Sequence, residues 1–598
     1  MEGLRRLEYR GYDSAGIAVV ADQAIAMAKR AGKLVNLEKA LAEQPLPMAT
    51  TGIGHTRWAT HGAPNDRNAH PHVAPDSHIA LVHNGIIENF ARLRAELEDA
   101  GSEFASETDT EVVAHLLSAV YDPSTGLAEA MRVVCRRLEG AFTLVAIHAN
   151  EPGVVVAARR NSPLVVGRGD GENFLGSDVA AFIGSTRTAI EMGQDQVVRL
   201  TADSVEITGF DGQPAAINEY HIDWDVAAAE KGGYEYFMLK EIAEQPQAVA
   251  DTLLGRIDPS GRLILDEMRL SDDDLRGIDK IVLIACGTAY HAGMIAKYAI
   301  EHWTRIPCEI ELASEFRYRD PILTRDTLVI AISQSGETMD TLMALRHARE
   351  QGARVLAVCN VNGSTIARES DAVVYTHAGP EIAVASTKAF LTQVVAVQLV
   401  ALYLAQVRGT KWAEEIRQHI DQLAQLPAKI ESLLPTLEPV RELAQSLAGS
   451  RAVLFIGRHV GYPVALEGAL KLKELAYMHA EGFAAGELKH GPIALLEEGL
   501  PVVVVVPSPR GRGVLHDKVI SNIQEVRARG ARTLVIAEEG DTAVEPYADT
   551  LIRIPAVPTL MQPVLATIPL QVFACALAAA RGFDVDQPRN LAKSVTVE

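Results

Sequence analysis

The feature that most constrains this chain is a short polar stretch, SQSGET, at residues 333–338. It follows residues 327–332, an apolar and β-branched run that is typical of a buried parallel strand. It precedes residues 339–350, where apolar side chains recur at helical spacing. The stretch therefore predicts a turn at a helix N-terminus, where the first N–H groups lack helical partners and the dipole favours an anion.

A phosphate is the ligand that such a turn suits best. Gly336 allows the backbone to approach the anion closely, and no Lys or Arg is present or required. The alternative is an ordinary serine N-cap without a ligand. Several hydroxyl groups, an amide and a glycine within six residues exceed what a cap needs, so we favour the phosphate interpretation.

Strands and helices alternate around this turn, which predicts a doubly wound parallel sheet. Apolar runs at residues 280–285, 355–358 and 372–375 read as strands, with a small-residue turn at 286–289 and a helix at 290–302. The same alternation of strand-like and helix-like segments recurs from residue 452 to the apolar region 563–580. Two copies of one fold are therefore expected.

The second copy lacks an SQSGET equivalent and is expected to supply catalytic groups instead. Glu467, Lys471 and Glu474 fall at i, i+4 and i+7, which places them on one helix face. A solvated charge ladder is the alternative, but the apolar surroundings favour burial of a carboxylate with a raised pKa. His490 stands in a segment expected to be a loop between helices, 486–492, and has a side chain suited to proton transfer. A phosphate site, a Glu base and a His together suggest aldose–ketose chemistry on a sugar phosphate.

The first 217 residues show short apolar runs between turn residues, which predicts stacked sheets with helices. Arg57 and Asp109 suit the carboxylate and the amine of an amino acid. Asn84 and the backbone N–H of Gly85 suit an oxyanion hole, although His-Asn-Gly alone is merely a good turn.

Composition limits the partners. A chain of 598 residues exceeds one core and predicts three or four domains, and its formal charge of −21 opposes nucleic acid. Its five cysteines show no metal or disulfide spacing, which favours the reducing cytoplasm. The start is charged, so no secretory signal is expected, and residues 563–580 are expected to be a buried helix rather than a membrane span.

Seven motifs together resemble one family: HTRWATHG, HNGIIEN, SETDTE, SQSGET, ASTKAF, ELKHGP and DQPRNLAKSVTVE. The chain is similar, almost end to end, to the glutamine–fructose-6-phosphate aminotransferases (isomerising). The resemblance implies a four-layer α+β glutaminase domain of the Ntn-hydrolase type and two doubly wound sugar isomerase (SIS) domains, an overall α/β protein. It also implies L-glutamine and fructose 6-phosphate as substrates, glucosamine 6-phosphate and glutamate as products, no metal or organic cofactor, and a homodimer.

The resemblance assigns roles to individual residues. For glutamine these are Arg57 and Asp109 as ligands, Asn84 and Gly85 at the oxyanion, Thr60 and His61 in the wall, and Trp58 at the ammonia passage. For the sugar they are Thr288, Ser333, Gln334, Ser335 and Thr338 at the phosphate, and Val384 and Ser386 at the hexose. Glu474 moves the proton, Lys471 lies near the enediol, His490 of a neighbouring subunit assists ring opening, and Lys593 acts on the carbonyl.

Two departures from the family matter. The family nucleophile is an N-terminal Cys whose own amine is the base, whereas this sequence begins Met1-Glu2-Gly3-Leu4 and has its earliest cysteine at Cys135. We favour a start assigned at an internal Met over a chain without glutaminase activity. Ala289 replaces a serine of some relatives, a loss of about 0.5–1.5 kcal/mol for one neutral hydrogen bond.

The expected domains are a glutaminase domain at 1–217, a linker at 218–274, SIS domains at 275–410 and 445–584, a helical connector at 411–444 and a catalytic tail at 585–598. Two alternatives to the full enzyme are open. An ammonia-dependent synthase or bare phosphohexose isomerase follows from the absent Cys. A non-catalytic sugar-phosphate sensor is disfavoured by the lack of a DNA-binding segment and by the negative charge.

Overall fold

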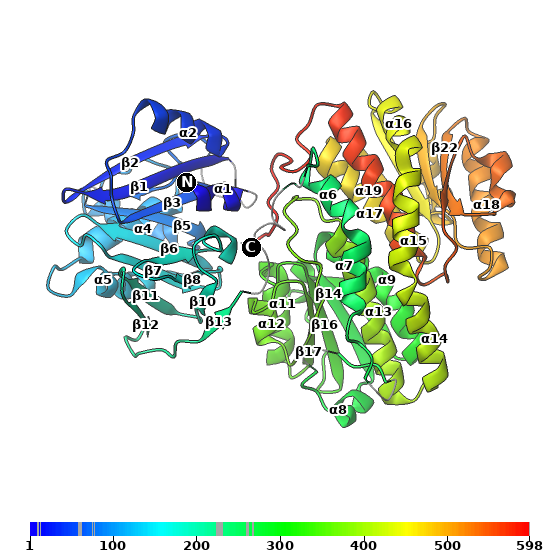
Figure 1. The fold of residues 1–598 in the computed structure, drawn as a ribbon, viewed down its shortest axis with the longest axis horizontal. Coiled ribbons are helices and arrows are strands. Elements are labelled where there is room, and N and C mark those ends of the chain that lie inside the picture. Colours follow the sequence, from blue (N-terminus) through cyan, green and yellow to red (C-terminus); the bar gives the residue numbers. More distant parts are fainter. Residues whose placement is uncertain are drawn as a thin grey trace. The chain divides into compact units, whose positions relative to one another are not determined.

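The fold is taken from a computed structural model that describes residues 1–8, 11, 13–57, 63–74, 76, 78–222, 231, 233–258, 262–265 and 268–596. The chain divides into two compact units. Figure 1 colours the ribbon by position in the sequence, from blue at the N-terminus to red at the C-terminus. The first unit comprises residues 1–227 and 592–598, and the second comprises residues 228–591.

Within its described residues, the first unit contains three antiparallel sheets. The three-stranded sheet has the order β2 (Ala24–Ala31), β1 (Ser14–Ala21), β3 (Gly52–Arg57). The four-stranded sheet has the order β13 (Glu219–His221), β10 (Thr188–Glu191), β8 (Val165–Arg168), β9 (Asn173–Gly176). The six-stranded sheet has the order β12 (Val205–Gly209), β11 (Gln196–Leu200), β7 (Val155–Arg160), β6 (Phe142–His148), β5 (Ile79–Gly85), β4 (His72–Val73).

Successive side chains of β5 point to opposite faces of the six-stranded sheet, so that different layers pack on the two faces. Leu81 faces the helices α3 (Phe90–Asp99), α4 (Asp109–Val120) and α5 (Gly126–Cys135), whereas Val82 packs with Val20 and Ile53 of the three-stranded sheet. The four-stranded sheet packs on the same inner face through residues such as Val166. On the outer side α2 (Leu34–Glu43) packs against β1, and α1 (Glu2–Leu7) contacts β3 and η2 (Val179–Ala181). The four-layer architecture expected for this domain is confirmed.

In the part of the second unit that the structure describes, there are two five-stranded parallel sheets with the same strand order. The first runs β15 (Cys308–Leu312), β14 (Lys280–Ala285), β16 (Thr327–Ser333), β17 (Arg354–Cys359), β18 (Ala372–Tyr375). The second runs β20 (His479–Ala484), β19 (Ala452–Gly457), β21 (Pro501–Val505), β22 (Arg532–Glu538), β23 (Thr550–Ile554). The expected repeat of a doubly wound fold is therefore present.

Four helices form the centre of this unit and share one hydrophobic cluster with both sheets. They are α9 (Gly287–Thr304), α13 (Lys388–Arg408), α17 (Gly461–Ala476) and α19 (Gln562–Ala580), and α9 contacts both α13 and α17. Helices α13 and α19 are long and apolar enough to cross a membrane, but 89% and 83% of their apolar windows are buried in the fold. The buried helix expected at residues 563–580 is thus confirmed.

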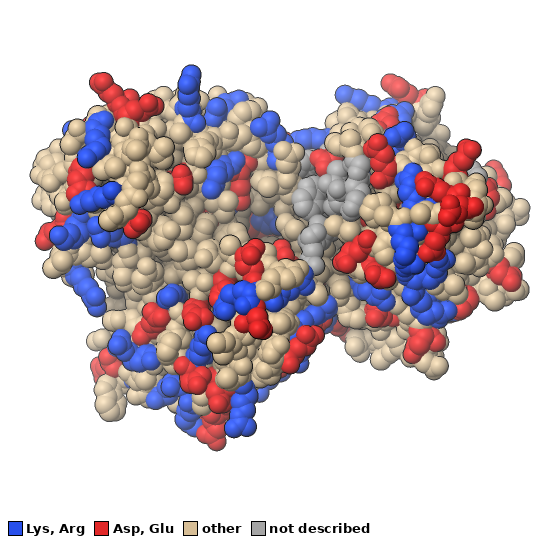
Figure 2. Space-filling view, turned by 180° about the vertical axis from the view of Figure 1, so that it is seen from behind, with Lys and Arg blue, Asp and Glu red and all other residues tan. Residues whose placement is uncertain are grey.

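The remaining elements of the second unit cover these sheets and connect them. They are α6 (Phe237–Ala243), α7 (Gln245–Leu253), α8 (Asp272–Gly277), α10 (Ala313–Phe316), α11 (Met339–Glu350), α12 (Thr365–Glu369), α14 (Ala413–Ala424), α15 (Leu426–Leu433), η4 (Leu434–Leu437), α16 (Glu438–Ser446), η5 (Glu487–His490), η6 (Pro492–Leu495), α18 (Gly513–Arg527) and η7 (Thr542–Tyr547). On the face drawn in Figure 2, basic and acidic side chains are interspersed.

Two local expectations differ from the structure. Helix α9 begins at Gly287, so Thr288 and Ala289 lie in its first turn rather than in a separate turn. The segment before His490 is a strand, β20, and not a helix. Its sequence HAEGFA has weak strand propensity, and parallel pairing with β19 decides its conformation.

Candidate active sites

The SQSGET turn connects β16 to α11 at the carboxyl edge of the first parallel sheet. The hydroxyl of Ser333 accepts a hydrogen bond from the N–H of Gly336 at 3.0 Å and lies 3.1 Å from the Thr338 hydroxyl. Gly336 has φ +65°, and a Cβ there would lie 1.9 Å from the Oγ of Ser364. Only glycine fits this position, because both the dihedral and the space exclude a side chain.

A buried carboxylate ties this turn to the next helix. Glu337 Oε1 accepts a hydrogen bond from Thr365 N at 2.8 Å, and the Gly336 carbonyl accepts one from Ile366 N at 3.0 Å. The hydroxyl of Ser335 accepts from the N–H of Glu337 at 3.2 Å. Ser333 and Ser335 are buried, while Gln334 and Thr338 are half-buried. The hydroxyl and N–H groups of this turn are therefore uncharged and held in place by hydrogen bonds at the start of α11.

A chain of charged groups links α9 to α17. Lys471 donates hydrogen bonds to Thr288 Oγ1 at 3.0 Å and to Glu474 Oε2 at 2.5 Å, and it lies 3.5 Å from Glu467 Oε1. Thr288 in turn donates to Glu467 Oε1 at 3.0 Å, and His291 lies 2.7 Å from Glu467 Oε2. The three α17 residues therefore share one face, as their spacing predicts.

Burial of these charged side chains decreases from Glu467 to Glu474. The side chains of Glu467 and Lys471 are 0% and 1% exposed, whereas that of Glu474 is 20% exposed. Burial opposes ionisation of Glu467, but attraction to Lys471 and hydrogen bonds from His291 and Thr288 lower its pKa below the ordinary value. The raised pKa expected for a buried glutamate on this face is therefore wrong for Glu467, because a cation and two donors outweigh desolvation. Burial likewise opposes the charge of Lys471, but Glu474 and Glu467 raise its pKa.

The hydroxyl of Thr288 already has two partners in the structure. Its single hydroxyl proton is donated to Glu467, and its lone pair accepts from Lys471. Its backbone N–H lies in the first turn of α9, where N–H groups lack intrahelical partners. We therefore expect a phosphate to meet the backbone at Thr288 rather than its hydroxyl.

Of the other predicted sugar residues, Val384, Ser386 and His490 lie in the second unit, whereas Lys593 groups with the first. The hydroxyl of Ser386 donates to Glu381 Oε2 at 3.1 Å, and the charge of Glu381 contributes to the raised pKa of Lys471. The N–H of Val384 donates to the Asp586 carbonyl at 3.0 Å. His490 ends η5 with an exposed side chain. Lys593 is half-buried and belongs to the segment 592–596 that groups with the first unit.

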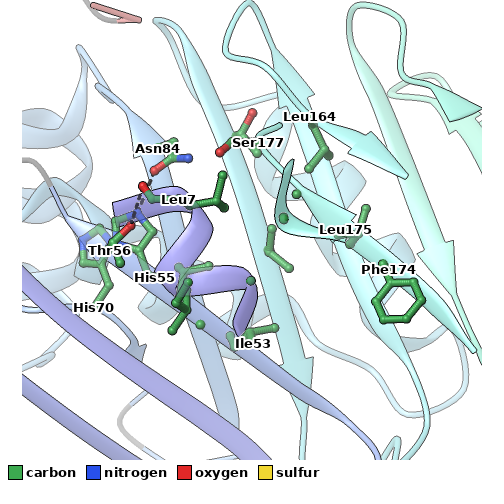
Figure 3. A pocket seen from close by; sticks show the side chains of 18 of the residues that line it. Leu7, Ile53, His55, Thr56, His70, Asn84, Leu164, Phe174, Leu175 and Ser177 are labelled. Atoms are coloured by element: carbon green, nitrogen blue, oxygen red, sulfur yellow. Dashed lines mark hydrogen bonds between the residues drawn. The ribbon is translucent and has the colours of Figure 1, made fainter. Parts of the chain in front are cut away.

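A cavity of about 690 Å³ occupies the first unit (Figure 3). It is lined by residues 52–57 of β3 and 173–176 of β9. Among the described strands, β3 and β9 are edge strands of their sheets. The predicted glutamine-site residues that line it are Arg57, Asn84, Gly85 and Asp109. The structure therefore brings these four residues to one cavity.

Asn84 is held by a buried histidine. The Nε2 atom of His55 lies 2.7 Å from Asn84 Oδ1, which leaves the amide nitrogen for another partner (Figure 3). Desolvation lowers the pKa of His55 to about 4, so the ring is neutral near pH 7 and its N–H is the donor. Gly85 has φ +127°, and a Cβ there would lie 2.0 Å from the Ala141 carbonyl oxygen.

Arg57 and Asp109 carry the charge in this cavity. Both side chains are buried, and burial lowers the pKa of Arg57 while the carboxylates of Asp109 and Asp13 oppose that effect. Asp109 begins α4 and accepts a hydrogen bond from Ile87 N at 2.9 Å. A guanidinium beside a carboxylate at a helix start suits an amino acid that carries both charges.

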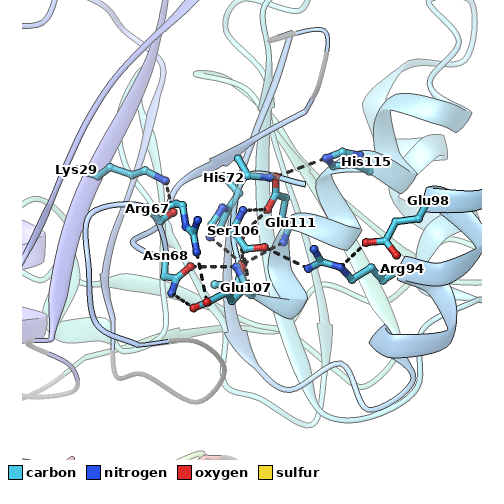
Figure 4. A network of polar contacts seen from close by, with 12 residues as sticks. Lys29, Arg67, Asn68, His72, Arg94, Glu98, Ser106, Glu107, Glu111 and His115 are labelled. Atoms are coloured by element: carbon cyan, nitrogen blue, oxygen red, sulfur yellow. Dashed lines mark hydrogen bonds and ion pairs between the residues drawn. The ribbon is translucent and has the colours of Figure 1, made fainter. Parts of the chain in front are cut away.

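The SETDTE motif contributes Ser106, Glu107 and Glu111 to a network of polar contacts at the start of α4 (Figure 4). Glu111 accepts hydrogen bonds from Ala105 N at 2.7 Å and from both the N–H and the hydroxyl of Ser106 at 2.6 Å. Although burial opposes it, these bonds and one from His115 lower the pKa of Glu111 to about 2. Thr108 caps the helix through the N–H of Glu111. Glu111 is thus a structural residue that fixes the start of α4.

Some expected features lie elsewhere. Trp58, Thr60 and His61 fall outside the described residues. None of the five cysteines lines the cavity: Cys135, Cys308, Cys359 and Cys575 are buried, and Cys286 lies in the second unit. Within the described ranges, no group of three or more His, Cys, Asp or Glu side chains has the arrangement of a metal site.

Comparison with known proteins defines the class of protein. The glutamine amidotransferase domain family matches residues 55–184, and the SIS domain family matches residues 274–403 and 446–581. This is therefore a glutamine amidotransferase domain joined to a pair of SIS domains, as the two units display.

Individual relatives define the family. The chain is 74% identical over 598 residues to glutamine–fructose-6-phosphate aminotransferase (isomerizing) of Streptomyces coelicolor, covering 100% of this chain and 97% of the relative. It is 65% identical over 601 residues to the protein of that name from Corynebacterium diphtheriae, covering 100% and 96%. The C-terminal domain of glucosamine-fructose-6-phosphate aminotransferase from Francisella tularensis has a TM-score of 0.57 and 40% identity over 60% of this chain and 99% of that chain. The chain belongs to the glutamine–fructose-6-phosphate aminotransferase (isomerizing) family.

Sequence reasoning passed over several residues that shape these sites. His55 is the first residue of the HTRWATHG motif, but the motif gives no sign of its contact with Asn84, which lies 29 residues later. His291 lies one helical turn after Thr288, and that i, i+3 spacing was the available signal. Its partner Glu467 is far away in sequence, so only the packing of α9 on α17 reveals the pair.

Proposed function

We propose that this chain makes glucosamine 6-phosphate and glutamate from L-glutamine and fructose 6-phosphate. The first unit hydrolyses glutamine to glutamate and ammonia, and the second condenses that ammonia with the ketose and isomerises the product. The observation that carries the proposal is the Lys471–Glu474 contact of 2.5 Å, which pairs a fully buried ammonium with a partly accessible carboxylate. The near full-length likeness to the named relatives supports the same reaction.

In the first unit, Arg57 binds the α-carboxylate of glutamine and Asp109 binds its α-amine. Attack on the side-chain amide places negative charge on its oxygen, and the Asn84 amide nitrogen and the Gly85 N–H stabilise that charge. His55 keeps the Asn84 oxygen turned away from this position. Trp58, Thr60 and His61 are proposed to complete the wall and the ammonia exit.

In the second unit, the phosphate of fructose 6-phosphate binds Ser333, Gln334, Ser335, Thr338 and the backbone at Thr288. Val384 and Ser386 contact the hexose. Ammonia adds at C2 with loss of water, and Glu474 then removes a proton from C1 and returns it to C2, which gives the 2-amino aldose. Lys471 stabilises the negative charge that develops between these atoms.

Further assignments belong to the same proposal. His490 is proposed to assist ring opening from a neighbouring subunit of a homodimer, and Lys593 to engage the sugar carbonyl. The exposed position of the His490 side chain supports a role at another surface. We also propose the cytoplasm as the location, because the buried thiols and the substrates suit a reducing, metabolite-rich compartment.

The test is product formation with each nitrogen donor. The chain as given is incubated with fructose 6-phosphate and either glutamine or ammonium, beside a form extended upstream by a Cys-bearing strand. Glucosamine 6-phosphate from ammonium, and from glutamine in the extended form, is the expected result. No glucosamine 6-phosphate under any of these conditions refutes the proposal.

One alternative has an observation in its favour. Because no cysteine lines the cavity, the chain as given is a candidate ammonia-dependent synthase or phosphohexose isomerase. That alternative predicts product from ammonium alone. Glutamine-dependent product from the chain as given would contradict it.

A further inference from the structure

A histidine outside the predicted machinery touches the most buried carboxylate of the second unit. His291 lies on α9 with its side chain 13% exposed, and its Nδ1 is 2.7 Å from Glu467 Oε2. Glu467 is 0% exposed and offers two oxygens to this environment. Thr288 occupies Oε1, so His291 supplies the hydrogen bond to the other oxygen.

The direction of this bond follows from the partner. Glu467 is ionised, because its pKa is lowered by Lys471, His291 and Thr288 despite burial. A carboxylate only accepts, so Nδ1 of His291 must carry the proton and donate it. A buried carboxylate that lacks a donor is costly, and more so when it is charged.

Lys471 transmits the state of Glu467 to the reacting position. Its ammonium has three donor directions, which point to Thr288, Glu474 and Glu467. If Oε2 of Glu467 lost its donor, the carboxylate would either take a proton or draw the ammonium towards itself. Both changes weaken the bond that Lys471 makes to Glu474.

We infer that His291 is a positioning residue for the isomerase step, which holds Glu467 ionised and thereby fixes Lys471 against Glu474. This inference rests on the proposed function, because it concerns the proton transfer assigned to Glu474. His291 itself touches neither the SQSGET turn nor Glu474 through any hydrogen bond of the described residues. Its effect should therefore fall on the chemical step and not on binding of fructose 6-phosphate.

The test compares His291→Leu, His291→Asn and His302→Leu in the full chain, with ammonium as donor. Asparagine places its amide nitrogen where Nδ1 stood, so it keeps the donor. His302 is an exposed histidine on the same helix whose neighbours are Lys411, Arg305 and Arg512, so it is the matched control. We expect His291→Leu to lower kcat about tenfold to a hundredfold, the equivalent of one lost hydrogen bond to a charged group. KM for fructose 6-phosphate should stay within about twofold, since that change is only about 0.4 kcal/mol.

His291→Asn should return kcat to within about threefold of the wild type, as expected when the donor is kept, and His302→Leu should leave it unchanged. An unaltered kcat in His291→Leu overturns the inference, as does an equal loss in His291→Asn, because the donor would then not be the cause. A parallel rise in KM would also overturn it. A wild-type chain without product refutes the proposed function together with the positioning role, whereas an active wild type with an active His291→Leu refutes the positioning role alone.

Discussion

The two units differ in the groups that surround the atoms proposed to react. In the first unit the buried charges Arg57 and Asp109 are assigned to the two ends of the amino acid, and the group that holds Asn84 is neutral. Among the described residues near Asn84, the first unit gathers the buried histidines His55, His70, His72 and His83, with ring centroids of His55 and His70 at 4.5 Å and of His70 and His72 at 5.0 Å. Burial lowers the pKa of His55 to about 4 and that of His72 to about 3, so both rings are neutral near pH 7. The second unit instead buries an alternating chain of charges, Glu467, Lys471 and Glu474.

This difference fits the two reactions proposed. Stabilising an oxyanion requires fixed neutral donors, and a neutral imidazole can hold the Asn84 amide without attracting or repelling the substrate. Moving a proton between carbons requires a base whose charge is balanced locally, which a buried ammonium provides. The SQSGET turn refines the comparison, because it is proposed to bind an anion with neutral groups inside the unit that buries the chain of charges.

The largest expected effect comes from removing Glu474, the proposed base of the second unit. Glu474→Gln should lower ammonia-dependent product formation by about 10³-fold, within the range of general base catalysis. Binding of fructose 6-phosphate, measured as a thermal shift, should persist. Lys473→Gln, an exposed neighbour on the same helix, is the control. Full activity of Glu474→Gln would break the comparison, since the charges would then not serve the reaction.

Removing the central cation should affect stability as well as rate. Lys471→Met leaves Glu467 buried without its charge partner, which typically costs about 3–5 kcal/mol. Urea unfolding followed by hydrogen exchange in residues 452–476 measures this loss. In the double variant with Glu467→Gln most of the stability should return, because no unpaired charge remains. A single variant as stable as the wild type would show that the chain of charges is not a coupled unit.

Acid should unfold the first unit before the second. An unfolded histidine takes up a proton below about pH 6.5, whereas folded His55 does so only near pH 4. The unfolded form therefore gains protons over this interval, and folding stability falls as pH decreases, by about 3 kcal/mol for one such histidine. In the second unit the pKa values of His302, His419 and His459 are also lowered by burial, but these side chains are exposed or half-buried, so we expect a smaller loss from each. The lowered pKa of Glu467 adds a loss only below its ordinary value of 4.5.

Hydrogen exchange of the full chain at pH 7, 5.5 and 4.5 compares the two units directly. Peptides from β1, β3 and β5 should lose protection first, and those from β14 and β16 later. His55→Gln should reduce the pH sensitivity of the first unit. Equal loss of protection in both units at pH 5.5 would contradict the contrast between neutral and charged sites.

The sequence predicted the helices and strands well where local pattern and tertiary context agree. Residues 339–350 form α11 and residues 280–285 form β14, as their spacing indicates. It failed at β20, whose pairing with β19 comes from the sheet and not from its own residues. Among the site residues, the shared face of Glu467, Lys471 and Glu474 could be predicted from their i, i+4, i+7 spacing, because all three lie on one helix.

Contacts between segments that are distant in the chain could not be predicted from the sequence. The pKa of Glu467 depends on His291 and Thr288, which lie more than 170 positions earlier on another helix. The Asn84–His55 bond joins two strands of different sheets. Whether a buried carboxylate is raised or lowered in pKa depends on such partners, so spacing alone gave the wrong direction for Glu467.

The smallest expected effect tests the neutral turn within the charged unit. Ser335→Ala removes one neutral hydroxyl from the proposed phosphate site, a change worth about 0.5–1.5 kcal/mol, or roughly twofold to tenfold in KM for fructose 6-phosphate. The value of kcat should change less than about twofold, because ground state and transition state bind the phosphate alike. Ser370→Ala is the matched control, since its buried hydroxyl donates only to the Ile366 carbonyl on α12. If Ser335→Ala lowered kcat with KM unchanged, the turn would take part in the chemical step, and the division between neutral binding groups and charged reacting groups would fail in this unit.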